Sequence, residues 1–280
     1  MQGPGRAACL LARGMGAAVI EVANTASAVT DLARAWRGYL RGRVIALTGS
    51  VGKTTTKNLV RDVCAAYGSV VATRGNQNNE LGVPRTLLAA DPETAVVVVE
   101  MGMRGSGQIA ELCDFVRPDW GLVTNVGESH IELLGSRENI ARAKAELYAA
   151  LPAGRGRAFL NLDGAYLDVL MEAGGLRERP MLLSGFAGNP DEDLREMLER
   201  DGAVCEEVVW AEDVTLDGEG RARFALCARD HADHEEEALL ALVERCRCAL
   251  TLTGAHNVDN AVAAASVGFA LGLDLETIAA

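Results

Sequence analysis

Short apolar runs alternate with longer segments of helical periodicity between residues 41 and about 175. The runs are rich in valine and other apolar residues, a pattern typical of strands buried on both faces of a sheet. The strands that this pattern predicts are 44–48, 69–72, 95–100, 122–125 and 158–161. Because strands and helices alternate, we expect an α/β fold with a mostly parallel sheet and helices on both of its faces.

Helical periodicity and weaker strand signals cover the rest of the chain. The predicted helices are 28–39, 53–67, 106–116, 137–151 and 256–271, and a further helical pattern starts at 274. Residues 176–250 are more acidic and less regular, and they predict a small antiparallel extension over 207–211, 222–227 and 247–253. A short helix-like piece at 10–15 and a strand at 17–22 are predicted near the N-terminus.

A glycine-rich segment directly follows the first predicted strand. Residues 48–57 read T-G-S-V-G-K-T-T-T-K, and its glycines allow the backbone to curl so that several N–H groups point inward. The helix that begins near Lys53 adds the positive end of its dipole. Lys53 can reach the terminal phosphates of a nucleotide, and Thr54 can place its hydroxyl on a magnesium ion. The segment therefore predicts binding of ATP or GTP.

The loop is a shortened form of the usual phosphate-binding sequence. Leu47 stands where the common form has a further glycine, so the loop reads G-x-x-G-K-T-T. A surface turn that contains Gly-Lys-Thr by chance is the alternative. The strand pattern before the loop and the helix pattern after it favour the phosphate loop.

Composition narrows the classes of function. The net charge is −12, which argues against non-specific binding to nucleic acid and requires positive charge to be concentrated near a bound nucleotide. Seven scattered cysteines fit neither a disulfide framework nor a zinc site. The apolar start at 7–20 is interrupted by Arg13, which disfavours a signal peptide, and no stretch is long enough to span a bilayer. We therefore expect a cytoplasmic protein.

Two predicted strand ends carry candidate metal ligands. Glu100 ends the run V-V-V-V-E at the edge of the sheet where ligands bind, and it can complete a magnesium shell begun by Thr54. His130 lies in the polar loop after 122–125 and can ligate a metal or contact phosphate. The alternatives are a solvent-facing glutamate and an ordinary surface histidine. Lys144 lies on a predicted helix, where lysines are usually solvated.

Two further segments are rich in amides. Residues 75–84, G-N-Q-N-N-E-L-G-V-P, can present hydrogen-bond donors to a polar substrate, or they form a turn. Residues 254–260 precede and open the last long helix, so their polar side chains can face a nucleotide, although an N-cap explains one of them. His231 and His234 form H-x-x-H in an acidic stretch, which we interpret as solvent-exposed.

Together and in this order, five segments resemble the Mur ligase family. They are T-G-S-V-G-K-T-T at 48–55, V-E-M-G at 99–102, T-N-V-G-E-S-H at 124–130, A-K-A-E-L at 143–147 and G-A-H-N-V-D-N-A at 254–261. Within the family, 75–84 and 100–104 are most similar to the member that uses D-alanyl-D-alanine. The resemblance implies the P-loop-type central domain of these ligases.

The resemblance implies an activity. ATP would phosphorylate the terminal carboxylate of a UDP-linked muramoyl tripeptide, and the amine of D-alanyl-D-alanine would attack the acyl phosphate to form an amide. A ligase acting on folate or a polyamino acid and a truncated, non-catalytic nucleotide-binding module are the alternatives. A GTPase switch is disfavoured because the chain has no N-K-x-D motif.

The resemblance also assigns roles to residues. Those implied to contact the nucleotide are Gly49, Ser50, Val51, Gly52, Lys53, Thr54, Thr55, His256, Asn257 and Asn260. Thr54 and Glu100 would hold a first magnesium ion and His130 a second. Lys144 matches a family lysine that CO₂ carbamylates into an anionic magnesium ligand, so Lys53, His130 and Lys144 form the implied catalytic set. Asn78 and Asn79 match a substrate-facing loop.

The resemblance covers about residues 17–280. Because family members have three domains, we expect residues 1–40 to be a remnant of the N-terminal UDP-substrate-binding domain with its linker. Residues 41–280 would be the ATP-binding central domain, and the C-terminal domain would be absent. The expected partners are the UDP-linked tripeptide and D-alanyl-D-alanine, with no nucleic acid and no membrane insertion, and we expect a monomer.

Overall fold

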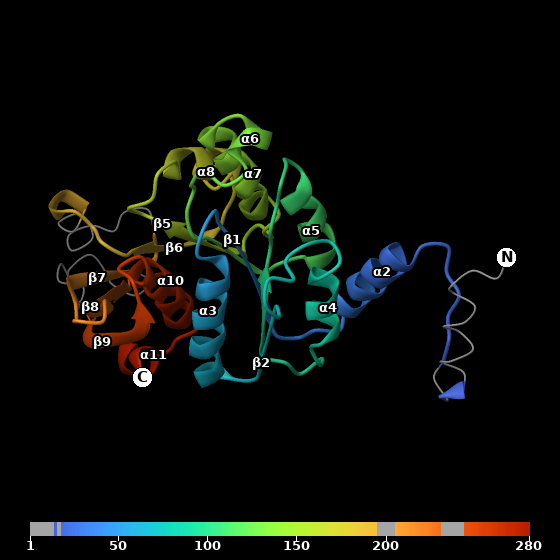
Figure 1. Ribbon diagram of the computed structural model, residues 1–280, viewed down its shortest axis with the longest axis horizontal. Coiled ribbons are helices and arrows are strands. Elements are labelled where there is room, and N and C mark those ends of the chain that lie inside the picture. The colour runs from blue at the N-terminus through green and yellow to red at the C-terminus, as the bar shows by residue number, and fades with distance from the viewer. Residues whose placement is uncertain (1–13, 16–17, 195–204, 231–243) are drawn as a thin grey trace.

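The computed structural model describes residues 14–15, 18–194, 205–230 and 244–280 (Figure 1). Within these residues a single sheet of nine strands has the order β2-β3-β1-β4-β5-β6-β7-β8-β9. The strands are β1 Arg43–Thr48, β2 Val70–Ala72, β3 Val96–Glu100, β4 Trp120–Val123, β5 Arg157–Asn161, β6 Leu182–Ala187, β7 Glu207–Leu216, β8 Arg221–Asp230 and β9 Glu244–Thr253. Neighbours from β2 to β7 pair in parallel, whereas β7, β8 and β9 pair antiparallel.

Helices cover both faces of the parallel part of this sheet. They are α2 Thr25–Arg37, α3 Lys53–Tyr67, α4 Val83–Leu88, α5 Gln108–Val116, α6 Ile131–Leu134, α7 Arg137–Ala149, α8 Leu167–Ala173, α10 Asn257–Ala270 and α11 Leu275–Ala279. Helices α3, α10 and α11 share one apolar core with the sheet, and α2, α4, α5, α7 and α8 share the other. Figure 1 shows α3 and α10 next to each other on the first of these faces. None of the helices in the described ranges has the length and apolar character that a bilayer crossing requires.

Strand β1 illustrates why the sheet is buried on both sides. Ile45 and Leu47 pack into the core under α3 and α10, while Val44 and Ala46 pack into the core on the other face. All four side chains are fully buried, and burial contributes about 1.5–3 kcal/mol for each large aliphatic side chain. A continuous apolar run rather than an alternating one is therefore the correct signature for this strand.

Strand β1 lies between β3 and β4 in the sheet. After β1 the chain continues to β2 and β3 on one side and then crosses to β4 on the other side, so the strand order reverses at β1. Leu47 pairs with Glu100 of β3 on one side and with Leu122 of β4 on the other. Crevices at such switch points are where ligands bind in open parallel sheets. The register therefore places the loop after β1 between the ends of β3 and β4.

Most of the sequence predictions for the fold are confirmed. The helix at 53–67 has the predicted bounds, and the antiparallel extension forms as β7, β8 and β9. The extension continues the main sheet because β6 and β7 pair in parallel. The predicted strand 122–125 is shifted to Trp120–Val123, since the next residues turn away to bond the loop after β1.

Other predictions differ from the structure. Residues 18–22 form no strand, and the sequence patterns did not predict β6, α4 or α8. Most of the helix-like piece at 10–15, as well as His231 and His234, lies outside the described residues.

Helix α2 is fastened to the sheet-covering helices by polar contacts. Trp36 Nε1 donates to the carbonyl oxygen of Ala90 at 2.8 Å, and Arg37 forms an ion pair with Asp119 at 2.9 Å. Its N-cap Asn24 accepts a hydrogen bond from the backbone N–H of Ser27. Residues 25–37 are therefore packed against the same body as the strands that follow.

Candidate functional site

The loop after β1 requires glycine at two positions. A Cβ atom at Gly49 would overlap the hydroxyl of Thr124, so the loop lies directly against the end of β4. Gly52 has φ 78°, in the left-handed region that favours glycine, and a Cβ there would lie 2.5 Å from Asn260 Oδ1. The two glycines thus let the loop pass between β4 and α10.

Asn125 fixes the shape of this loop. Its Oδ1 accepts hydrogen bonds from the backbone N–H groups of Ser50 and Val51 at 3.1 and 3.0 Å, and its Nδ2 donates to the Val51 carbonyl at 3.0 Å. The Ser129 hydroxyl donates to the Ser50 carbonyl at 3.3 Å. The N–H groups of Ser50 and Val51 are thus engaged by the protein. The first helical turn, from Lys53 to Thr55, has donors without intrahelical partners, and these can bind an anion.

Lys53 folds back over the loop that precedes it. Its Nζ donates to the carbonyl oxygens of Gly49 at 2.7 Å and Ser50 at 3.2 Å. Burial lowers the pKa of Lys53, and the nearby negative charge of Glu100 opposes that shift. The ammonium group therefore lies at the carboxyl end of the sheet, beside the candidate metal ligands.

Glu100 is the carboxylate at the centre of the site. It is fully buried at the end of β3, and its carboxylate accepts from the Thr54 hydroxyl at 3.1 Å and from Asn78 Nδ2 at 2.8 Å. The Glu100 backbone N–H donates to the Thr73 hydroxyl at 3.0 Å, which holds the strand end in place. The structure thus brings together Thr54 and Glu100, which the sequence predicted to lie close to each other. It also places Asn78 of the amide-rich loop against Glu100, a contact that the sequence did not predict.

A cavity of about 1100 Å³ opens beside these residues. Lys53, Asn78, Asn79 and His130 all contribute to its wall. The others that line it are Thr30, Arg34, Asn76, Gln77, Glu80, Gly102, Met103, Arg104, Gln108, Glu111, Leu112, Asp114 and Phe115. Amide and charged groups predominate near Lys53, so the cavity suits a polar, anionic ligand.

His130 and Asn79 face this cavity with different local roles. His130 is half-buried at the start of α6 with φ 67°, a conformation uncommon for a residue other than glycine and found often at functional sites. Asn79 Oδ1 accepts from the backbone N–H groups of Leu81 and Gly82 at 3.3 and 3.0 Å, so its oxygen shapes the turn before α4. Only the amide nitrogen of Asn79 is left to meet a ligand.

Lys144 is a buried lysine on α7. Its side chain is 2% exposed. Burial, reinforced by repulsion from Lys53, lowers the pKa of Lys144 to about 7. Within the described ranges no carboxylate forms an ion pair with Lys144. A substantial share of this amine is therefore neutral and nucleophilic near neutral pH.

Asn257 and Asn260 of α10 lie next to the start of α3, and both are hydrogen-bonded to other protein groups. Asn260 Oδ1 accepts from the Thr56 hydroxyl at 2.9 Å, and Asn260 Nδ2 donates to Asn257 Oδ1 at 2.9 Å. Asn257 Nδ2 donates to the Thr253 carbonyl at 2.8 Å, so the amide groups of both asparagines have protein partners. His256 is exposed at the start of the helix. The asparagines brace the loop and α3 from behind, whereas His256 is open to solvent.

The donor set at Glu100 fits a hard cation such as magnesium. Among the described residues, no group of three or more His, Cys, Asp or Glu side chains could hold a metal ion together. The protein offers a carboxylate and the hydroxyl of Thr54, both oxygen ligands. Magnesium is commonly held by one or two protein groups, with phosphate oxygens and water completing its shell. The site therefore fits a magnesium ion that arrives with a nucleotide.

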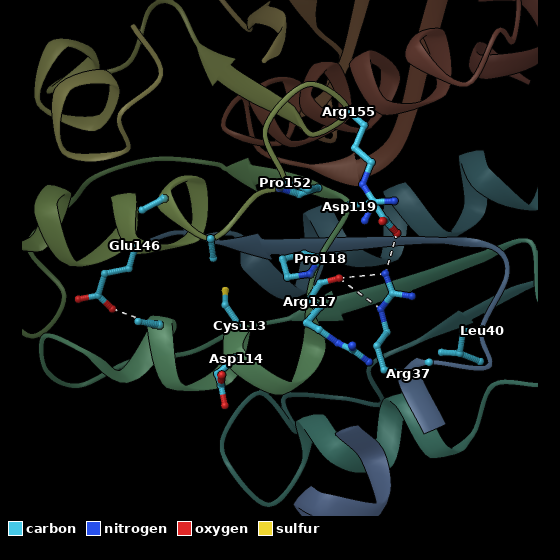
Figure 2. A pocket seen from close by; sticks show the side chains of 14 residues that line it. Arg37, Leu40, Cys113, Asp114, Arg117, Pro118, Asp119, Glu146, Pro152 and Arg155 are labelled. Atoms are coloured by element: carbon cyan, nitrogen blue, oxygen red, sulfur yellow. Dashed lines mark hydrogen bonds and ion pairs between the residues drawn. The ribbon is translucent and has the colours of Figure 1, made fainter. Parts of the chain in front are cut away.

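A second cavity, of about 780 Å³, lies at the other end of the strands (Figure 2). Of the residues that line it, Asp119 directly precedes β4 and Arg155 lies two residues before β5. Figure 2 shows Arg37 held by Asp119 and by the carbonyl oxygen of Arg117, each at 2.9 Å. Because this cavity opens at the amino ends of the strands, whereas ligands bind at the carboxyl ends, we assign the chemistry to the first cavity.

Sequence reasoning missed two residues of the site, Lys57 and Asn125. Lys57 is 2% exposed and lies 3.8 Å from Glu100 Oε2. Its position four residues after Lys53 places both lysines on one face of α3, which was the available signal. Asn125 was seen only as part of a polar loop, and its contact with Val51 depends on tertiary structure.

The chain is similar to known ligases in both sequence and structure. Residues 47–268 match the model of the Mur ligase middle domain. The UDP-N-acetylmuramoyl-tripeptide–D-alanyl-D-alanine ligase of Mycobacterium bovis is 36% identical over 268 residues, which make up 95% of this chain and 45% of that protein. The chain thus spans about half the length, or less, of the curated relatives that it matches.

Solved structures that resemble this chain include ligases of the same kind. MurF from Acinetobacter baumannii has a TM-score of 0.73 at 30% identity, covering 93% of this chain and 50% of that one. MurF ligase from Thermotoga maritima, solved in complex with ADP, has a TM-score of 0.66 at 25% identity, covering 93% and 53%. The family model covers most of the described sheet and its loop after β1, so the chain belongs to the Mur ligase family.

Proposed function

We propose that this chain is the ATP-binding part of a ligase that joins D-alanyl-D-alanine to a UDP-linked muramoyl tripeptide. The observation that carries the proposal is the contact of Thr54 and Asn78 with the buried Glu100 carboxylate, beside Lys53 and a cavity of about 1100 Å³. Relatives that bear the name of this ligase match up to 96% of the chain. This combination favours acyl activation by ATP over a simple binding function.

The nucleotide would lie on the loop after β1. The free N–H groups from Lys53 to Thr55 and the positive end of α3 would receive its phosphates, with Gly49 to Gly52 forming the curled backbone. Lys53 Nζ would leave the carbonyl oxygens of Gly49 and Ser50 for the terminal phosphates. Asn257 and Asn260 would support this loop from behind, and His256 would approach the nucleotide from the exposed end of α10.

Thr54 and Glu100 would hold a magnesium ion, with His130 as a ligand of a second ion. Bound magnesium would neutralise phosphate charge and polarise the transferred phosphoryl group. Glu100 is oriented for this role by Asn78 and by the backbone contact to Thr73. These contacts fix the carboxylate before a ligand arrives.

Lys144 would supply a further anionic group after carbamylation. Its neutral Nζ would attack the carbon of CO₂, forming an N–C bond, and would release one proton to give a carbamate. The low pKa of about 7 leaves enough neutral amine for this reaction near neutral pH. Bicarbonate added to a CO₂-depleted enzyme should raise its activity and should leave a Lys144→Gln variant unchanged. An equal response of both proteins would contradict this role.

The tripeptide carboxylate would enter the cavity beside Lys53, and Asn78 and Asn79 would face it. Transfer of the γ-phosphoryl group to that carboxylate would give an acyl phosphate and ADP. The amine of D-alanyl-D-alanine would then attack the acyl carbon, an amide bond would form, and phosphate would leave. The protein's contribution to these steps is positioning and neutralisation of charge.

We also propose a division of the chain and a setting for it. Residues 1–40 would belong to a UDP-substrate-binding domain and its linker, and 41–280 would form the ATP-binding domain. The substrates implied by this proposal are cytoplasmic precursors, and the protein would act there as a monomer.

The proposed function is tested by phosphate release. The natural polypeptide that contains these residues should release phosphate from ATP only when UDP-linked muramoyl tripeptide and D-alanyl-D-alanine are both present. Single omissions of each substrate, and replacement of ATP by GTP, serve as controls. Equal release without the dipeptide would contradict the proposal, and turnover with folate and glutamate instead would indicate a related ligase.

A further inference from the structure

Lys57 connects the candidate metal ligand with the substrate-side loop. Its Nζ lies 3.8 Å from Glu100 Oε2 and donates to the carbonyl oxygen of Gly75 at 2.8 Å. The Lys57 side chain is 2% exposed and that of Glu100 is fully buried. The Lys57 ammonium group is therefore buried between Glu100 and the Gly75 carbonyl, which distinguishes this pair from a solvent-exposed ion pair.

Lys57 is the ion-pair partner of Glu100, and the positive charge of Lys53 also acts on this carboxylate without forming an ion pair with it. The other side-chain partners of Glu100, Thr54 and Asn78, are neutral groups. The pair with Lys57 is the one salt bridge that Glu100 forms in the described part of the chain. A buried carboxylate without a cation is strongly unfavourable, so Lys57 stabilises the site in the absence of a metal ion.

The loop from Gly75 to Gly82 is linked to Glu100 in two ways, indirectly through Lys57 and directly through Asn78. At one end, Gly75 accepts the hydrogen bond from Lys57. In the middle, Asn78 donates through its side chain to Glu100 and accepts through its carbonyl oxygen from the Gly102 N–H at 2.8 Å. The same loop lines the cavity of about 1100 Å³. A change in charge at Glu100 therefore alters the interactions of Lys57, and with them the hydrogen bond that Lys57 donates to Gly75 in this loop.

We propose that Lys57 is a positioning residue that competes with magnesium for Glu100 and couples metal binding to the order of the 75–82 loop. The inference rests on the proposed function, in which Glu100 binds magnesium. A divalent cation at Glu100 repels the ammonium group of Lys57 and cancels its attraction to the carboxylate. Lys57 then bonds Gly75 more strongly, and the loop becomes more rigid beside the cavity.

The coupling predicts that Lys57→Met changes two quantities in opposite directions: magnesium affinity rises, and hydrogen-exchange protection of the 75–82 loop falls. Lys57→Met removes a cation next to the metal site, so magnesium should bind more tightly, by about fivefold to a hundredfold. The same substitution removes the donor to Gly75, so the 75–82 loop should lose protection from hydrogen exchange. A side chain that only fills space would not tighten magnesium binding.

The experiment uses the 280-residue chain. Magnesium is titrated at fixed ATP by calorimetry, thermal melting is followed with and without Mg·ATP, and hydrogen exchange is measured at 75–82. Lys57→Arg keeps the charge and should restore values near those of the wild type. Arg41→Ala, which removes an exposed cation that pairs with Glu93, is the control and should change none of them.

The expected result is a lower melting temperature for Lys57→Met without ligand, with most of the loss recovered when Mg·ATP binds. An equal loss in both conditions, together with unchanged magnesium affinity, would overturn the inference. If Lys57→Met fails to fold, the wild type decides, because protection at 75–82 must rise when Mg·ATP replaces ATP alone. Unchanged protection there overturns the coupling. Glu100→Gln separates the two proposals, because wild-type magnesium affinity in that variant counts against the metal site itself.

Discussion

Asn125 and Val51 form a reciprocal pair of hydrogen bonds between the end of β4 and the loop after β1. Asn125 Oδ1 accepts from the Val51 N–H at 3.0 Å, and Asn125 Nδ2 donates to the Val51 carbonyl at 3.0 Å. The same Oδ1 accepts from the Ser50 N–H at 3.1 Å. One side chain therefore satisfies three backbone groups of the loop and holds the first turn of α3 in position for a ligand.

Removal of this side chain should weaken nucleotide binding without unfolding the protein. Asn125→Ala loses three hydrogen bonds, each worth about 0.5–1.5 kcal/mol, and part of that loss appears as disorder of the loop. We expect the dissociation constant for Mg·ATP to rise by about tenfold, measured by calorimetry. Asn139→Ala removes an exposed amide of α7 as a control and should leave it unchanged. Wild-type affinity for Asn125→Ala would show that the loop holds its shape without this residue.

Gly49 should tolerate no side chain. A Cβ at this position overlaps the Thr124 hydroxyl, and the third-nearest atom is the Asn125 backbone nitrogen at 3.5 Å. Gly49→Ala should therefore displace the loop from β4 and lower both the melting temperature and the affinity for ATP. Gly218→Ala is the control, because a Cβ there meets nothing within 4 Å. Thermal melting and ATP titration of both variants check this, and equal behaviour of the two would contradict the observed packing.

Lys53→Ala should abolish phosphoryl transfer and leave the fold intact. Within the described residues the Lys53 ammonium group makes hydrogen bonds only to the carbonyl groups of Gly49 and Ser50 in its own loop, so few tertiary contacts are lost. Loss of the positive charge at the terminal phosphates should reduce turnover by at least about a hundredfold. Circular dichroism controls for folding. Turnover within a few fold of the wild type would remove Lys53 from the mechanism.

Replacement of Lys144 should raise the melting temperature by an amount that depends on pH. The pKa of Lys144 is lowered to about 7 in the folded chain, chiefly by burial, from the ordinary lysine value of 10.5. Between these values the unfolded state binds more protons, so the cost of burying Lys144 falls as the pH rises. Lys144→Met removes this cost and should raise the melting temperature most at about pH 6, with a gain that shrinks toward about pH 10.

This experiment is run without CO₂, because a carbamate would alter the charge of the wild type. The Lys144→Met gain is compared with that of Arg177→Met, a substitution on an exposed ion pair with Asp168. A gain that is constant across the pH range would mean that Lys144 titrates as an ordinary lysine.

The sequence predicted local structure well where one pattern dominates. Helix α3 begins at Lys53 and ends at Tyr67 as predicted, because Gly52 and Gly68 flank a segment whose apolar residues recur with helical spacing. The strand ending in Glu100 was also predicted, since four valines favour a buried strand. The bounds of β4 were shifted because Thr124 and Asn125 bond the loop after β1 instead of extending the strand.

The proximity of Thr54 and Glu100 was predicted from the sequence, whereas several supporting contacts were missed. Thr54 and Glu100 meet because the loop after β1 and the end of β3 lie at the same edge of the sheet. The contact of Asn78 with Glu100 was not predicted. Lys57 and Asn125 were missed because their partners, Gly75 and Val51, are 18 and 74 residues away in sequence. Contacts of this kind follow from tertiary packing and leave no local pattern.

The most direct test of the account is calorimetric titration of the chain with ATP, with and without magnesium, for the wild type and Glu100→Gln. If Glu100 and Thr54 hold the ion that accompanies the nucleotide, magnesium should tighten ATP binding to the wild type by about tenfold or more. Glu100→Gln should lose most of this gain, and circular dichroism checks that the variant is folded. No binding of ATP to the wild type, or an equal magnesium gain in both proteins, would contradict the central claim.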